Sequence, residues 1–129
     1  MTDRDEIAVF EDALIEDVAA AHDVSTDRLT ELARSHQSNV RDLPGVDNIV
    51  YEWRNHFHLD PLLVRTEDAY YLALPDHVWE EFADDFAADD GELSALRALH
   101  EAQSRADAPE IGLDTSRLDG DGAVVLVRP

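Results

Sequence analysis

Apolar residues recur three or four positions apart in three successive stretches of the first half of the chain, which is the spacing of a helix with one buried face. The stretches cover residues 4–22, 25–40 and 46–57, and the first predicts either one long helix or two short ones. Ser25 or Thr26 is placed to cap the second helix. The apolar positions are Ile7, Phe10, Leu14 and Val18, then Leu29, Leu32, Ala33, His36 and Val40, then Val46, Ile49, Val50, Trp53 and Phe57.

The pattern changes in the second half of the chain. Two runs rich in β-forming residues, 62–66 and 69–74, flank a polar pair and predict a β-hairpin. Helical spacing then returns from Pro75-Asp76 onward, and the buried positions of this fourth helix are Val78, Trp79, Phe82 and Phe86. Asp89 and Glu92 predict a capping box at the start of a fifth helix that ends near Ala106.

Glycine and proline mark the breaks between these elements. Leu43-Pro44-Gly45 predicts a break before the third helix, and Pro109 and Gly112 predict loop after the fifth. Residues 119–122, Asp-Gly-Asp-Gly, predict a turn, and the apolar segment 123–127 is expected to add a third strand to the hairpin.

The predicted fold class is therefore α+β, with a trihelical core, a β-hairpin and two C-terminal helices. The core is assigned to residues 1–60, and the hairpin, the C-terminal helices and the final strand to residues 61–129. Because 129 residues fall within the usual size of one domain, the two parts are expected to pack together as a single domain.

Composition removes several classes of protein. The chain has no Cys, so it forms no disulfide and offers no thiol nucleophile or zinc-thiolate site. No apolar run approaches the roughly 18 residues of a membrane helix, and the N-terminal residues do not form a signal peptide. We therefore expect a soluble cytoplasmic protein with no membrane partner.

The charge balance is strongly acidic. The chain has 30 acidic and 10 basic residues, a net charge of -20, no Lys, 19 Asp against 11 Glu, and one Met. This composition resembles the proteins of extremely halophilic archaea, which implies a cytoplasm rich in potassium chloride. At 1 M salt the screening length is about 3 Å, so repulsion among the acidic residues costs little and they act as a hydrated surface.

The charge is also unevenly distributed. Residues 1–24 carry eight acidic residues and one Arg, and residues 67–129 carry sixteen and four. Residues 25–66 carry six acidic residues and five Arg, so this part is nearly neutral. A polyanion or an acidic partner is expected to meet the protein here.

Residues 17–32, Asp-Val-Ala-Ala-Ala-His-Asp-Val-Ser-Thr-Asp-Arg-Leu-Thr-Glu-Leu, resemble the helix-turn-helix of bacterial and archaeal transcription regulators. The resemblance implies that the helix from Ser25 to about Gln37 lies across the major groove of double-stranded DNA. It also implies a winged-helix arrangement with Arg65 near the wing. The residues expected to contact DNA are Ser25, Thr26, Arg28, Thr30, Arg34 and Arg65.

Two departures from the helix-turn-helix pattern keep an alternative open. Asp23 stands at the turn position usually held by Gly, and Asp27 and Glu31 lie on the outward face, where they would meet phosphate. The first hypothesis is a non-catalytic DNA-binding transcriptional regulator of a halophilic archaeon. The alternative is a protein-protein interaction adaptor that docks through the hairpin or the C-terminal helices, or a homodimer. Because neighbours on a strand face opposite ways, one of Tyr70 and Tyr71 is expected to be exposed at such a surface.

Catalytic and metal chemistry find little support in the sequence, and no cofactor or metal is expected. His56 and His58 face different ways on a helix, so they would bind one metal with Asp60 only in an extended chain. Residues 119–122 lack the further acidic ligands of a calcium loop. No nucleophile elbow or glycine-rich phosphate loop occurs, so an enzyme is not expected; a ligand in a pocket lined by His56 or His58 would reopen that question.

Overall fold

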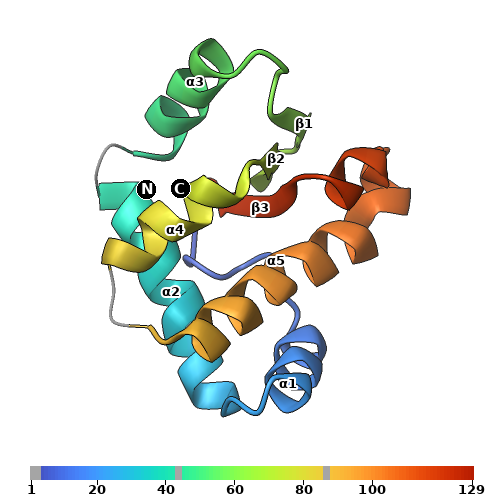
Figure 1. Ribbon diagram of the computed structural model, residues 1–129. Helices are drawn as coiled ribbons and strands as arrows, with labels where there is room; N and C mark the ends of the chain where they lie inside the picture. The colour runs from blue at the N-terminus through green and yellow to red at the C-terminus, as the bar shows by residue number, and fades with distance from the viewer. Residues whose placement is uncertain (1–3, 43–44, 86–87) are drawn as a thin grey trace.

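The structure is a computed structural model that describes residues 4–42, 45–85 and 88–129 of the chain. The described residues form five α-helices, a short 3-10 helix and a three-stranded antiparallel sheet (Figure 1). The α+β class predicted from the sequence is confirmed. The elements are α1 Asp12–Ala21, α2 Thr26–Asp42, α3 Val46–His56, β1 Leu62–Arg65, β2 Ala69–Leu74, α4 Asp76–Asp85, α5 Asp90–Ile111, η1 Thr115–Asp119 and β3 Gly122–Val127.

The sheet has the order β1-β2-β3 and is antiparallel throughout. β1 and β2 form the predicted hairpin, and β3 pairs with β2 from Ala69 opposite Val127 to Leu74 opposite Gly122. The predicted third strand is therefore confirmed. Every residue of the central strand β2 is buried, because the sheet is covered on both faces.

Among the described residues, side chains and not a further strand close the outer edge of β3. The side-chain amide of Gln37 donates to the carbonyl of Val125 at 2.7 Å, and its oxygen accepts from the Val127 N–H at 2.9 Å. Nδ1 of His100 accepts from the Val125 N–H at 2.9 Å. These bonds satisfy backbone groups of a buried strand that would otherwise lack partners.

The core lies where α5 runs along β3 and contacts α1 and α2 (Figure 1). α2 turns its predicted apolar face inward, with Leu29, Leu32 and Ala33 almost fully buried. Trp79 of α4 is also fully buried, as its helical spacing predicted. The described part of the chain contains no helix long and apolar enough to cross a bilayer.

The first predicted helix is wrong in its extent, because only Asp12–Ala21 is helical. The preceding residues are held against the body of the protein by long-range contacts. The guanidinium of Arg4 donates to the carbonyl of Arg128 at 3.0 Å, and the Glu11 N–H donates to Gln103 at 2.9 Å. Phe10 is buried and packs edge-on against the ring of His100. The apolar spacing there reflects these contacts of an irregular segment.

The fifth helix is longer than predicted. It begins with the predicted capping box of Asp89 and Glu92, but it continues past Ala106 and Pro109 to Ile111. Pro109 lies in the last turn, where its missing N–H removes a single helical hydrogen bond. Gly112 then ends the helix with a left-handed φ of 70°.

The expectation that Tyr70 or Tyr71 is exposed is also wrong, because both are buried. The two side chains do leave the central strand on opposite faces, but each face is covered. The hydroxyl of Tyr70 donates to Asp47 of α3, and the hydroxyl of Tyr71 donates to Asp107 of α5 at 2.6 Å. The predictions for Leu43, Pro44 and Phe86 lie outside the described residues.

Candidate functional site

The turn between α1 and α2 is tightly built. Asp23 adopts a left-handed φ of 58°, the conformation that Gly takes most easily. The N–H of Val24 donates to the carbonyl of Ala19 at 3.0 Å, which folds the chain back on α1. Oγ of Ser25 then accepts from the N–H of Arg28 at 3.0 Å, so Ser25 caps the start of α2 as predicted.

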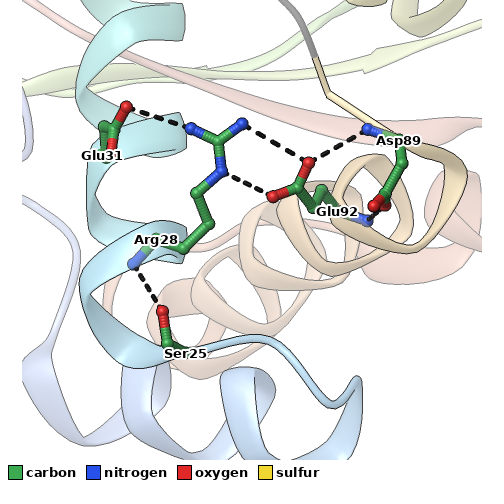
Figure 2. A network of polar contacts seen from close by, with 5 residues as sticks. All are labelled: Ser25, Arg28, Glu31, Asp89 and Glu92. Atoms are coloured by element: carbon green, nitrogen blue, oxygen red, sulfur yellow. Dashed lines mark hydrogen bonds and ion pairs between the residues drawn. The ribbon is translucent and has the colours of Figure 1, made fainter.

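Arg28, the first arginine expected to contact DNA, is partly buried and paired with acidic residues of its own chain (Figure 2). Its Nε donates to Glu92 at 2.5 Å, and its Nη1 donates to Glu31 at 3.0 Å. Glu92 is also the capping-box residue of α5, where it accepts from the N–H of Asp89. The hydrogen bond from Arg28 and the one from Asp89 lower the pKa of Glu92. Arg28 therefore joins the start of α2 to the start of α5.

Of the other residues of this region that were expected to contact DNA, some already bond to groups within the protein. Ser25 and Thr26 are exposed, but the hydroxyl of Thr30 donates to the carbonyl of Thr26 at 2.8 Å. The guanidinium of Arg34 donates to Glu6 at 2.8 Å and also contacts Asp5. The predicted residues thus lie together at the turn and along α2, but both Arg28 and Arg34 form ion pairs with acidic residues.

Arg65 differs from the other predicted residues in place and in environment. It lies on β1, and Figure 1 shows β1 at the opposite end of the molecule from the start of α2. Its side chain is exposed. All ten arginines fall within residues 4–42, 45–85 and 88–129, and Arg65 is the one whose side chain has no hydrogen bond or ion pair to those residues.

A cleft of about 390 Å³ opens between α3 and the hairpin, and Arg65 lines it. Its lining residues come from α3, from the segment that follows α3, and from strands β1 and β2. The lining residues are Asp47, Val50, Tyr51, Arg54, Asn55, Phe57, His58, Asp60, Leu62, Arg65 and Tyr70.

Both acidic residues of the cleft already have partners. Asp60 accepts from Nε and Nη2 of Arg54 at 3.1 and 2.9 Å, and from the N–H of Leu62. The hydrogen bond from Arg54 lowers the pKa of Asp60. Asp47 accepts from the hydroxyl of Tyr70, whose pKa is raised by burial first and then by Asp47. Arg65 is the charged group of the cleft that is left unpaired.

Two exposed apolar residues belong to the same segment of the protein: Tyr51 lines the cleft, and Leu59 stands in the chain between His58 and Asp60, which line it. Tyr51 is 70% exposed and Leu59 is 68% exposed, whereas the other large apolar residues described are at least partly covered. Tyr51 also borders a second, shallower hollow on the outer side of α3, with Trp53 and His56. We call the cleft together with Tyr51 and Leu59 the α3–hairpin face.

Most of this face was missed in the sequence. Tyr51 and Asn55 were not singled out from the sequence. Tyr51 falls outside the apolar stripe of α3, and an aromatic residue off the stripe predicts an exposed ring. His58 does line the cleft, whereas His56 lies at the outer hollow. In the part of the chain that the structure describes, no three His, Asp or Glu side chains gather as metal ligands.

The chain belongs to the family described as Domain of unknown function (DUF8048), which matches residues 8–128. The match extends from before α1 to the end of β3, so it includes both the α1–α2 turn and the α3–hairpin face. No curated protein and no solved structure matches the chain.

Proposed function

We propose that the protein is a protein-interaction module and that its partner docks on the α3–hairpin face. The observation that carries this proposal is a cleft lined by the exposed Tyr51, with the exposed Leu59 next in the chain to the lining residues His58 and Asp60. A single exposed apolar residue is ordinary, but apolar residues that border a hollow with polar groups around it are typical of a binding surface.

The sheet supports the same location. The outer edge of β3 is closed by Gln37 and His100, whereas β1, within the described residues, pairs with β2 alone. An edge strand with unpaired backbone groups accepts an extended segment of another chain. Leu62 and Arg65 of β1 line the cleft together with Tyr51, so the edge strand is part of the α3–hairpin face.

The proposal is tested with the protein isolated from its own cells after nuclease treatment. We expect a partner protein at a fixed ratio, and we expect Leu59→Asp to weaken its retention by at least about tenfold. Ala20→Asp is the matched control, because it places the same charge on the exposed side of α1. A protein that is isolated alone and is a monomer in solution contradicts the proposal.

DNA binding by a transcriptional regulator of a halophilic archaeon is the second candidate, and one specific observation favours it. The α1–α2 turn has a left-handed Asp23, a half-buried Val24 and an exposed start of α2, which are features of a helix-turn-helix. It ranks second because Arg28 and Arg34 would have to leave their acidic partners before they contact DNA. The trihelical helix-turn-helix core remains part of this second proposal.

Binding of labelled duplex DNA in molar potassium chloride tests the second candidate. If it holds, Arg28→Ala combined with Arg34→Ala abolishes binding, and Arg105→Ala on α5 does not. Circular dichroism must show that the double variant is folded, because Arg28 links two helices. Absence of binding by the unaltered protein, or equal binding by the folded double variant, contradicts it.

A further inference from the structure

We propose that the cleft recognises a carboxylate, namely an acidic side chain on the docked segment of the partner, and that Arg65 is the residue that binds it. This inference rests on the proposed protein-interaction function and specifies the chemistry of the partner. Its starting point is that Arg65 is exposed and unpaired at the wall of the cleft.

The unpaired state of Arg65 is unusual on this molecule. Acidic residues outnumber arginines by three to one, yet no acidic side chain of the described residues forms an ion pair with Arg65. Asp68, at the tip of the same hairpin, pairs with Arg4 at 3.3 Å. Arg65 therefore presents a guanidinium that no acidic group of the described residues pairs with.

The charges that line the cleft favour an anion there. Two arginines and two aspartates line it, so its formal charge is zero on a molecule with a net charge of -20. Both aspartates are bonded, Asp60 to Arg54 and Asp47 to Tyr70. An entering anion meets one uncommitted charge, and that charge is positive. The lining therefore adds no net negative charge that would repel an anion.

The neighbouring groups favour a peptide carboxylate over a nucleic acid phosphate. A guanidinium binds a carboxylate through two parallel N–H donors. Tyr51 and Leu62 add apolar contact for an adjoining side chain, and Asn55 adds an amide. Nucleic acid affinity, in contrast, is the sum of many phosphate contacts, and one unpaired arginine on a strongly acidic chain supplies one.

The test is an NMR titration in a salt concentration at which the protein is folded. The probes are two blocked peptides that each place one central residue between two leucines, glutamate in one and glutamine in the other. We expect the glutamate peptide to shift the side-chain Nε–H signal of Arg65 and to bind about tenfold more tightly than the glutamine peptide. Equal binding of the two peptides overturns the proposal.

Two variants locate the site. Arg65→Gln should remove the preference for glutamate, and Arg105→Gln, which changes an arginine of α5 outside the cleft, should preserve it. A preference that survives Arg65→Gln overturns the proposal. Because the side chain of Arg65 makes no hydrogen bond or ion pair to the described residues, its substitution should leave the fold intact, and circular dichroism checks this.

Retention of the cellular partner separates this proposal from the protein-interaction function. If Leu59→Asp releases the partner and Arg65→Gln retains it at full strength, the carboxylate proposal fails and the interaction function stands. If no partner is found but the glutamate peptide binds at Arg65, the interaction function fails and the carboxylate site stands.

Discussion

His36 of α2 is fully buried, and neither of its ring nitrogens has a hydrogen-bond partner among the residues that the structure describes. Its ring packs against Phe82, Trp79 and His100, with centroid distances of 4.3, 5.1 and 5.2 Å. Burial lowers the pKa of His36 to about 3, and burial together with the nearby His36 lowers the pKa of His100 well below its usual value. The folded protein therefore holds both imidazoles neutral.

This arrangement predicts a loss of stability on mild acidification. The unfolded chain binds a proton at each histidine below a pKa of about 6.5, whereas the folded protein does not. The free energy of unfolding should thus be highest above that pH. It should fall by about 2 kcal/mol per histidine between pH 7.5 and 5. Urea unfolding at pH 7.5, 6 and 5 measures the effect before most carboxylates are protonated.

The variant His36→Leu provides the control. It removes one titrating group and two unpartnered nitrogens while keeping a side chain of similar volume. We expect it to be at least as stable as the unaltered protein at pH 7.5 and to lose about half of the pH dependence. A pH dependence identical to that of the unaltered protein would show that His36 does not titrate in this window.

Helical spacing allowed the burial of single residues to be predicted from the sequence. The ion pairs between residues far apart in the chain could not be predicted. The helical spacing of His36 with Leu32 and Val40 placed it correctly on the buried face. Of the two acidic partners of Arg28, Glu31 is local, but Glu92 lies 64 positions away in the chain, so no local pattern indicates the ion pair with Glu92. For the same reason the sequence did not distinguish Arg65 from the paired arginines.

At the scale of elements, the contact between α2 and β3 depends on Gln37. Its side chain is 1% exposed and bonds both the carbonyl of Val125 and the N–H of Val127. Gln37→Leu would leave both backbone groups buried and unpaired. We expect this substitution to lower the free energy of unfolding by about 2–4 kcal/mol, measured by urea unfolding, and to speed hydrogen exchange at the Val127 amide.

Asn39→Leu is the matched control for the Gln37 substitution, because Asn39 lies on the exposed side of the same helix. It should change the free energy of unfolding by no more than about 0.5 kcal/mol. If the two variants are equally stable, the side-chain closure of β3 does not contribute to the fold as inferred.

The elements themselves were largely predictable, since the helices α2 to α5 and the three strands follow apolar periodicity and turn residues. Errors occurred where tertiary contacts override the local pattern, as in residues 4–11 and at Pro109. The cleft was not predictable, because it depends on the separation of α3 from the hairpin. The burial of Tyr70 and Tyr71 likewise depends on helices that cover both faces of β2.

At the scale of the whole molecule, charge repulsion should control stability. The ion pairs of the arginines leave a net charge of -20. Salt weakens attraction and repulsion alike, but acidic residues outnumber arginines three to one, so repulsion is the larger contribution. We propose that the acidic surface is an adaptation to high salt. The protein should therefore be more stable in concentrated potassium chloride and should loosen or unfold in dilute buffer.

Thermal unfolding at 0.1 M and 1 M potassium chloride tests this proposal. The screening length falls from about 10 Å to about 3 Å over this range, so repulsion between acidic residues that are not in contact is largely removed. We expect Tm to rise by about 5 °C or more, which for a chain of this size corresponds to roughly 1–2 kcal/mol. Sucrose is the control, since it strengthens apolar burial without screening charge. A Tm that does not change with potassium chloride, or that rises equally with sucrose, contradicts a role for charge screening.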